Sequence, residues 1–352
     1  MDYILNGVGT GNVAERLIAC GFDANALRPF VGESGQSFVT ANQNNVLKAV
    51  RMANATATLR KDDWTLLDEA IVKAAKPRLK AVGDLRSAGL TYSIPNGMGK
   101  TVLETETVGD INDASVSMDA LRDNANDRPI FELTNLPLPI IHKDFSFSAR
   151  QIATSRNGGS PLDTTMAELA SRKVAEEAEK LLLGVSTVAD QYSFGGGVIY
   201  GYTDYPNRLT RTITSPATSG WTGATFLADV LAMRQQSVNA YHYGPWVLYV
   251  STAWDQYLDD DFKANSDKTT RNRVKELEGI TDIRTLDYLT GFDILLVQLT
   301  SNVVREVIGM DVTTVQWESK GGLQLDFKVM AIMVPQLRAD QNSNTGIVHG
   351  SV

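Results

Sequence analysis

The sequence predicts an α+β protein with more than one domain, and three observations support this expectation. A long amphipathic pattern from Pro161 to Leu183 predicts a single rod-like helix. The stretch from Leu90 to Pro137 alternates apolar and polar residues but contains nothing that could form a core. After Gly184 the chain alternates helical and strand patterns. A chain of 352 residues also has room for two or three domains.

Composition argues against several classes of protein. Hydrophobic residues make up 43% of the chain, so a large core is expected. The 33 basic and 41 acidic residues give a net charge of −8, which argues against a dedicated nucleic-acid binder, because such a protein needs a basic surface. A single cysteine, Cys20, excludes an intramolecular disulfide. The histidines His142, His242 and His349 are too widely spaced to indicate a zinc enzyme.

The N-terminus and the apolar runs indicate where the protein resides. The first residues lack the basic and apolar regions of a signal peptide. No apolar run approaches the ~18 residues that span a bilayer. We therefore expect a soluble protein of a reducing compartment.

The first 45 residues predict an extended arm rather than a domain. Glycines interrupt short apolar clusters, and only Val13–Cys20 has the pattern of a short helix. A segment of this size cannot bury its own apolar face. We expect it to lie either on its own core or on a neighbouring subunit.

A helix is predicted from Asp62 to Val82. Asp62 or Asp63 can cap it, and Pro77 is expected to kink it or end its regular part. Its apolar residues recur at helical spacing: Trp64, Leu67, Ile71, Ala74 or Ala75, and Leu79.

The stretch Leu90–Pro137 predicts a long two-stranded ribbon that projects from the body. It contains a turn at Pro95–Gly97 and a polar middle from Asp110 to Asp127. A two-stranded ribbon is marginally stable by itself, so it should pack on a partner.

The rod helix follows a strand in which Phe145 and Phe147 alternate with serines. Ser160–Asp163 resembles a capping box with proline at the first helical position, and Gly184 ends the helix. Its expected apolar stripe is Leu162, Met166, Leu169, Val174, Ala178, Leu181 and Leu182. Its outer face, expected to be solvated or to contact polar neighbours, is Arg172, Lys173, Glu176, Glu177 and Lys180.

The rest of the chain begins with a flexible turn at Gly195–Gly197. A helix is expected from about Ala224 to Ala240, stopped by Gly244-Pro245, followed by a buried strand at Trp246–Val250. The further expected strands are Asp293–Leu299, Val303–Ile308, Val312–Trp317 and Leu323–Val334.

Two glycine motifs suggest nucleotide binding but fit it poorly. Gly7–Asn12 lacks the buried strand and the third glycine of a dinucleotide fingerprint, so a flexible arm is favoured. Asn96–Thr101 ends like a phosphate-binding loop, but Ile94 occupies the position of its first glycine. A hairpin with a glycine-rich turn is the better interpretation.

No active site is predicted. The carboxylates of Asp259–Asp261 and of Glu176 and Glu177 are adjacent in sequence, so they face different directions in a helix and predict a solvated face. Cys20 has no evident histidine partner, and no nucleophile elbow is present. We therefore assign no catalytic, cofactor-binding or metal-binding residue.

The order of elements resembles that of Hong Kong 97-type major capsid proteins, in the branch shared by encapsulin nanocompartments and some tailed-phage capsid proteins. The resemblance covers about Arg60 to the end of the chain, and the order of its motifs is more specific than any one of them. The segments that carry it are Asp63–Ala70, Leu138–Phe145, Leu162–Gly184, Gly244–Tyr249 and Gly309–Asp311.

This resemblance implies a capsid fold with an N-terminal arm, an extended β-hairpin loop, a peripheral domain with a long spine helix, and an axial α/β domain. The implied boundaries are 1–59 for the arm, 60–88 and 137–184 for the first two parts of the peripheral domain, 89–136 for the extended loop, 185–311 for the axial domain, and 312–352 for the third peripheral part with a C-terminal tail.

The implied function is that of a major capsid protein of a tailed double-stranded DNA bacteriophage, which self-assembles into pentamers and hexamers of an icosahedral head enclosing the genome. An encapsulin-type shell around a cargo enzyme is the alternative, and a soluble α/β enzyme is the third hypothesis. The N-terminal 45 residues and the polar tail Arg338–His349 favour the phage. The net charge of −8 permits a lining that does not adhere to packaged DNA.

The expected partners are other copies of the chain, scaffolding, portal and cement proteins, and packaged DNA contacted non-specifically. No enzyme activity, cofactor or membrane contact is expected, and the protein should reside in the virion after assembly in the host cytoplasm. The prototype of the family joins an extended-loop lysine to a neighbour's asparagine. Lys100 is the only lysine of residues 89–136, and no matching acceptor is evident. We therefore expect a non-covalent shell.

Overall fold

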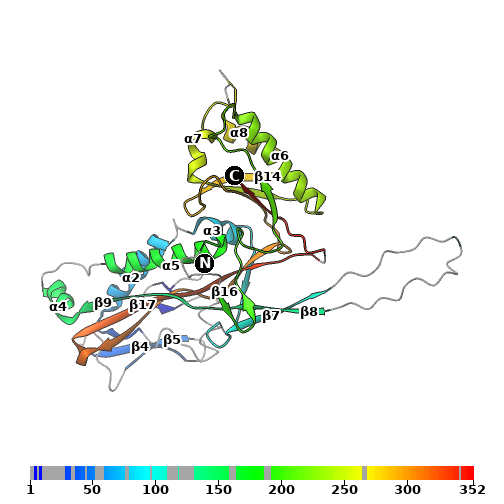
Figure 1. Ribbon diagram of the computed structural model, residues 1–352. Helices are drawn as coiled ribbons and strands as arrows, with labels where there is room; N and C mark the ends of the chain where they lie inside the picture. The colour runs from blue at the N-terminus through cyan, green and yellow to red at the C-terminus, as the bar shows by residue number, and fades with distance from the viewer. Residues whose placement is uncertain are drawn as a thin grey trace. The chain divides into compact units, whose positions relative to one another are not determined.

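The computed structural model of the chain divides into two compact units (Figure 1). The first unit comprises residues 1–101, 138–189 and 305–336, and the second comprises 102–137, 190–304 and 337–352. The residues that the structure describes are 4–5, 8–9, 28–32, 36–43, 46–51, 59–75, 79–95, 97–108, 118, 131–157, 164–185, 192–263, 268–340 and 342–352.

The first unit is built on a four-stranded sheet in the order β6-β16-β17-β9. The strands are β6 (Thr91–Ser93), β16 (Val304–Ser319), β17 (Gln324–Leu337) and β9 (Ile141–Ser148). β9 pairs antiparallel with β17 and β6 pairs parallel with β16. The alternation of Phe145 and Phe147 is confirmed, because both rings are buried against Phe327 of β17. The two strands expected at 303–308 and 312–317 form one continuous strand.

Among its described residues, this unit has the helices α2 (Lys61–Ala75), α3 (Lys80–Ser87), α4 (Ala149–Asn157) and α5 (Thr165–Leu183). The single helix expected from Asp62 to Val82 is therefore two helices, and Pro77 lies between them, outside the described residues. The expected buried residues Trp64, Leu67, Ile71, Ala75 and Leu79 are confirmed.

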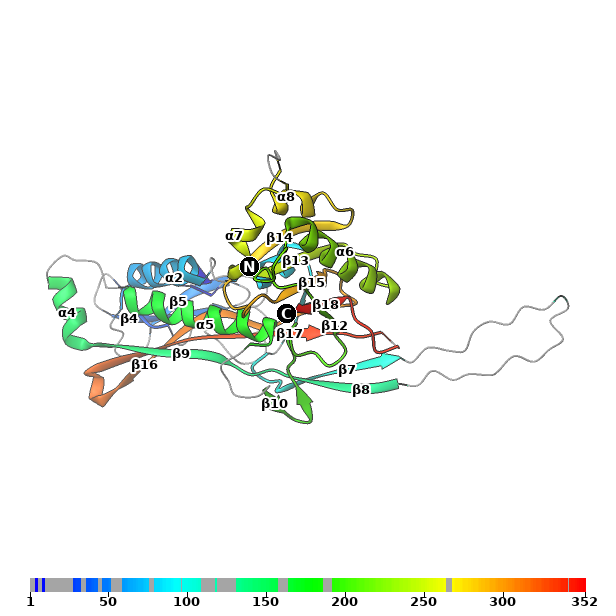
Figure 2. The same cartoon turned by 45° about the horizontal axis from the view of Figure 1, so that its top comes forward.

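The rod helix is α5, which runs along β9 in both views (Figures 1 and 2). Gly184 ends it in the left-handed region, at φ 81°, as expected. The expected stripe is wrong at Met166 and Leu169, which are 46% and 41% exposed. The buried face instead carries the small residues Ala167 and Ala170, which allow close packing against α2. The expected capping residues 160–163 lie outside the described part of the chain.

The N-terminal segment forms small sheets that the sequence did not indicate. β1 (Ile4–Leu5) pairs with β2 (Val8–Gly9), and β3 (Phe30–Val31), β4 (Ser37–Gln43) and β5 (Val46–Arg51) form a three-stranded antiparallel sheet. The expected helix at 13–20 lies outside the described residues.

This segment lies on its own core from residue 28 onward. The fully buried Arg28 forms an ion pair with Asp68 of α2 at 2.5 Å. The Trp64 indole N–H donates to the carbonyl oxygen of Pro29 at 3.0 Å. The arm was expected to lie either on its own core or on a neighbouring subunit. Arg28 and Pro29 lie on the core of their own chain.

The second unit is built on a five-stranded sheet in the order β12-β18-β15-β13-β14. The strands are β12 (Leu209–Thr212), β13 (Trp246–Ser251), β14 (Ile280–Leu286), β15 (Ile294–Gln298) and β18 (Ile347–Ser351). The buried strand expected at 246–250 is confirmed as β13. Residues 347–351, which the sequence analysis assigned to a tail, form β18 between β12 and β15.

One face of this sheet packs against α6 (Gly223–Asn239), α7 (Asp255–Leu258) and α8 (Thr270–Lys275). Phe226, Trp254 and Val274 from the helices are buried there with side chains of the strands. On the other face, Tyr202 stacks on Tyr249 of β13.

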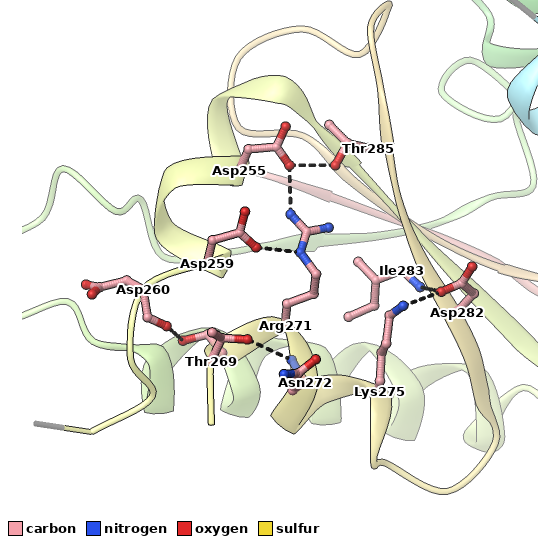
Figure 3. Close-up of polar contacts among 11 residues, drawn as sticks. Asp255, Asp259, Asp260, Thr269, Arg271, Asn272, Lys275, Asp282, Ile283 and Thr285 are labelled. Atoms are coloured by element: carbon pink, nitrogen blue, oxygen red, sulfur yellow. Dashed lines mark hydrogen bonds and ion pairs between the residues drawn. The ribbon is translucent and has the colours of Figure 1, made fainter. Parts of the chain in front are cut away.

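Arg271 ties α7, α8 and β14 together (Figure 3). Its guanidinium donates to Asp259 at 2.7 Å and to Asp255 at 2.8 Å, and Asp255 also accepts from the Thr285 hydroxyl. The solvated face expected at Asp259–Asp261 is confirmed, since all three are exposed, and Asp259 also joins this ion-pair network. Glu176, which was also expected on a solvated face, is buried instead. None of the described helices is long and apolar enough to cross a bilayer.

Candidate functional site: an acidic two-stranded ribbon

The predicted ribbon is present in the second unit at Val102–Val108 and Phe131–Pro137. Its expected first part is wrong, because Thr91–Ser93 form β6 of the first unit's sheet, paired in parallel with β16 rather than in a hairpin. β7 (Val102–Val108) pairs antiparallel with β8 (Phe131–Pro137), with Val102 opposite Pro137 and Val108 opposite Phe131. Thr105 and Thr134 lie opposite each other, and each hydroxyl also contacts the other residue's carbonyl oxygen. The two-stranded expectation is thus confirmed for these residues. Of residues 109–130, the described part includes only Met118.

The ribbon exposes apolar side chains next to carboxylates. Phe131 and Leu133 are 60% and 56% exposed. They lie on one face of the ribbon with Glu104 and Glu106, because directly opposed residues share a face and side chains alternate along a strand. Residues 102–137 contain eight acidic and two basic residues. This face of the ribbon therefore combines exposed apolar and acidic side chains.

A glycine-lined hairpin packs against the root of the ribbon. β10 (Ser193–Phe194) and β11 (Gly197–Val198) flank Gly195 and Gly196, and the Asn135 amide donates to the Gly195 carbonyl oxygen at 3.0 Å. A Cβ atom on Gly197 would lie 2.1 Å from the Asn135 carbonyl oxygen. The turn expected at 195–197 is therefore a position of close contact at Gly197, where no side chain fits.

The loop that resembled a phosphate-binding motif has a packing role. A Cβ atom on Gly97 would lie 2.5 Å from backbone atoms of Gly309 in β16. The two glycines thus allow the turn after β6 to touch a neighbouring strand directly. Lys100, the lysine of the same loop, is exposed.

A buried charge cluster holds α3, the helix that precedes β6 and the ribbon in the chain. The Arg86 guanidinium donates to Glu306 at 2.7 and 2.8 Å and to Asp311 at 3.2 Å. Burial raises the pKa of Glu306, and the neighbouring Arg86 opposes that rise. The sequence analysis missed this cluster because Arg86 is more than two hundred residues away from Glu306 and Asp311, and the three residues match no motif.

The remaining candidate residues of the sequence are not brought together in the described part of the chain. Cys20 lies outside the described residues. Among the residues that the structure describes, no three histidine, cysteine or acidic side chains are grouped as a metal site would require.

Comparison with known proteins decides the family. Residues 54–350 match a family described as a family of unknown function (DUF6260). The chain belongs to that family. This DUF6260 protein is also 24% identical over 271 residues to the type 1 encapsulin shell protein EncA of Myxococcus xanthus, a match covering 75% of this chain and 79% of EncA.

Two solved structures of other proteins share the fold of this chain. A virus-like particle protein from Pyrococcus furiosus matches with a TM-score of 0.57 at 16% identity, covering 81% of this chain and 98% of that chain. The capsid protein of Myoviridae phage XM1 matches with a TM-score of 0.53 at 9% identity, covering 75% of this chain and 90% of that chain. The Hong Kong 97-type fold expected from the sequence is therefore confirmed.

Proposed function

We propose that this DUF6260 chain is a shell subunit, specifically a major capsid protein that builds the icosahedral head of a tailed double-stranded DNA bacteriophage. The observation that carries the proposal is the ribbon on a Hong Kong 97-type fold. Phe131 and Leu133 remain exposed in the single chain, and binding between copies would bury them. Pentamers and hexamers of one chain would then repeat this contact around closed rings.

The N-terminal segment supports a phage head over a nanocompartment. The family match begins at residue 54, and the three-stranded sheet of β3, β4 and β5 precedes it. The resemblance to the encapsulin branch implies, by contrast, a start with only a short amphipathic helix. The end of the polar tail Arg338–His349 is part of β18, because that strand covers Ile347–Ser351, and the tail is not used for this choice.

An encapsulin-type shell is the second candidate, and the likeness to EncA over three-quarters of the chain favours it. In that case the enclosed material would be a cargo protein instead of DNA. In either case the subunit acts by assembly and needs no catalytic group.

The domains follow from the same proposal. The first unit, with α5 and the β16–β17 sheet, would be the peripheral domain, and the five-stranded sheet of the second unit would be the axial domain. The ribbon β7–β8 would be the extended loop. Scaffolding, portal and cement proteins remain proposed partners of the head.

Electron microscopy of the purified full chain tests the proposal. Large heads or open polyheads are expected when the chain is produced alone, because a phage head needs further proteins to control its size. Small uniform closed shells would favour the nanocompartment, and a monomer at every concentration would overturn both.

A further inference from the structure

The start of the short helix α3 is held by another helix. Leu79, at its N-terminal boundary, makes no side-chain cap, and the first turn of α3 contains no acidic residue. The first N–H groups of a helix have no partner within that helix. Glu179 of α5 supplies the acceptors, because its two carboxylate oxygens accept from the N–H groups of Ala81 at 2.6 Å and of Val82 at 3.2 Å.

The end of α3 is held by a strand. Arg86 in the last turn donates to Glu306 of β16 at 2.7 and 2.8 Å and to Asp311 at 3.2 Å. Between the two ends, Gly83 lowers the helix propensity, and no atom lies within 4 Å of the place where its Cβ atom would be. A helix of eight residues is not stable by itself in water. The order of α3 therefore depends on α5 and β16.

The apolar packing beneath α3 is incomplete, because a cavity lies between α3, α5 and β17. Its apolar lining is Val82 and Leu85 of α3, Ala178 and Leu182 of α5, and Met333, Val334 and Pro335 of β17. Side chains that border a void lose part of their dispersion contacts. Incomplete packing together with polar attachment at both ends is typical of a segment that opens locally before the rest of its domain unfolds.

The carboxylate that holds α3 is almost fully removed from water, since Glu179 is 1% exposed. Burial raises its pKa to about 7, and the two N–H groups oppose the rise. The charged residues of α3 that face it act in opposite directions, because Asp84 favours the neutral carboxyl group and Lys80 favours the carboxylate. When α3 leaves α5, water reaches this group and its pKa returns toward 4.5. The closed state therefore binds the proton of Glu179 more tightly than the open state.

The other charged groups at this contact form ion pairs of their own. Glu306 and Asp311 bind Arg86, and burial raises the pKa of Glu306 although Arg86 opposes the rise. The ion pairs on α5 itself are Glu176 with Arg172 and Lys173, and Glu177 with Lys180. A variant of Glu179 retains all of these groups, so its comparison with the wild type isolates the effect of Glu179.

We propose that α3 is a detachable clip: it opens from α5 while the sheet of the first unit stays folded, and the proton on Glu179 controls how tightly it closes. Opening of this kind does not depend on the proposed shell function. The clip is tightest below pH ~4.5, where Glu179 is protonated in both states. Between about pH 4.5 and about pH 7 the open fraction rises about tenfold per pH unit, and at higher pH it stays constant.

Hydrogen–deuterium exchange of the full chain, read by mass spectrometry of its peptides, tests the clip. The protection of the α3 amides is corrected for the pH dependence of chemical exchange and compared with that of β17 in the same unit. We expect α3 to be at least about tenfold less protected than β17 at each pH, because it opens without the sheet. The protection of α3 in the wild type should fall about 100-fold between pH 5 and pH 7.

Two variants and a control separate the contributions. Glu179→Gln is neutral at every pH and should remove this fall, whereas Glu168→Gln, at an exposed position of the same helix, should retain it. Gly83→Ala favours the helix and meets no neighbouring atom, so it should raise the protection of α3 about twofold to fivefold at each pH.

Equal protection of α3 and β17 would overturn the proposal, because α3 would then open only when the whole unit unfolds. A wild-type protection of α3 that does not change with pH, or that falls equally in Glu179→Gln, would remove the role of the proton. Unchanged protection in Gly83→Ala would also contradict the clip, because an eight-residue helix that leaves its neighbours must lose its helical order.

Discussion

Glu179 of α5 binds the backbone N–H of Ala81 in the first turn of α3, with 2.6 Å between the carboxylate oxygen and the nitrogen. The second carboxylate oxygen accepts from the N–H of Val82 at 3.2 Å. The residue preceding α3, Leu79, has no side chain that can cap the helix, so a glutamate from another helix does so. Burial of this carboxylate raises its pKa to about 7, although the two N–H groups oppose the rise.

The raised pKa makes the stability of the subunit depend on pH near neutrality. Glu179 has its ordinary pKa near 4.5 in the unfolded chain, so the folded state binds its proton more tightly. The contribution of Glu179 to the free energy of unfolding is fully present below pH ~4.5. It is lost as the pH rises through about 7, and the total loss is about 3 kcal/mol.

Glu179→Gln stays neutral at every pH and should remove this part of the pH dependence. Denaturant unfolding between pH 5 and pH 8.5 measures it, and the contribution of Glu306 cancels because both proteins retain that residue. The exposed Glu168→Gln on the same helix is the control. Identical slopes for the wild type and Glu179→Gln would show that the carboxylate is already charged at pH 5.

Replacing Arg86 should be strongly destabilising. Arg86→Met leaves Glu306 and Asp311 buried without their cation, and breaking a buried pair in this way costs roughly 3–5 kcal/mol. Arg273→Met, which removes a half-exposed partner of Glu276, should cost less than about 1 kcal/mol. Equal losses in thermal or chemical unfolding would mean that the cluster around Arg86 is no more important than a surface ion pair.

Gly197→Ala should loosen the root of the ribbon. The added methyl group would overlap the Asn135 carbonyl oxygen, and relieving such an overlap costs roughly 1–3 kcal/mol. Amide hydrogens of β7 and β8 should therefore exchange faster with solvent. The control is Gly83→Ala in α3, where no atom lies within 4 Å of the added Cβ, and ribbon exchange should be unchanged. Unaltered exchange in Gly197→Ala would mean that the hairpin β10–β11 does not hold the ribbon.

Assembled particles should dissociate completely in denaturing gel electrophoresis. Lys100 is exposed, whereas an amine that attacks an amide must be desolvated and deprotonated beside a general base. A single band near 38.4 kDa is expected. A ladder of boiling-resistant oligomers that disappears in Lys100→Arg would establish a covalent shell instead.

Local sequence signals predicted those elements whose stabilising contacts lie within or beside them. The alternation at Phe145 and Phe147, the apolar run of β13 and the terminating Gly184 each predicted what the structure has. The strands Val102–Val108 and Phe131–Pro137 were also predictable from their alternation. The expectation that this stretch holds no core residue is wrong, because Ile94, Leu103 and Leu136 are buried.

Elements that depend on distant contacts were not predictable. Two strands were expected on either side of Gly309, but this glycine lies within the continuous β16 and allows the close approach of Gly97. The apolar Met166 and Leu169 suggested the wrong buried face of α5, because the packing there uses small alanines and the buried Glu179. The root of the ribbon joins Asn135 to the glycines at 195–197, a contact that no single sequence window contains.

The position of β18 has a consequence for the timing of folding on the ribosome. β12 joins the five-stranded sheet only through β18, yet β18 is synthesised long after it, following every other strand of that sheet. Domains fold as units, and pairing between distant segments must wait until both have been made. The five-stranded sheet of the second unit is therefore complete only when residues 347–351 have left the exit tunnel. Nascent chains cannot present a finished second unit, which delays joining between subunits until synthesis has passed this strand.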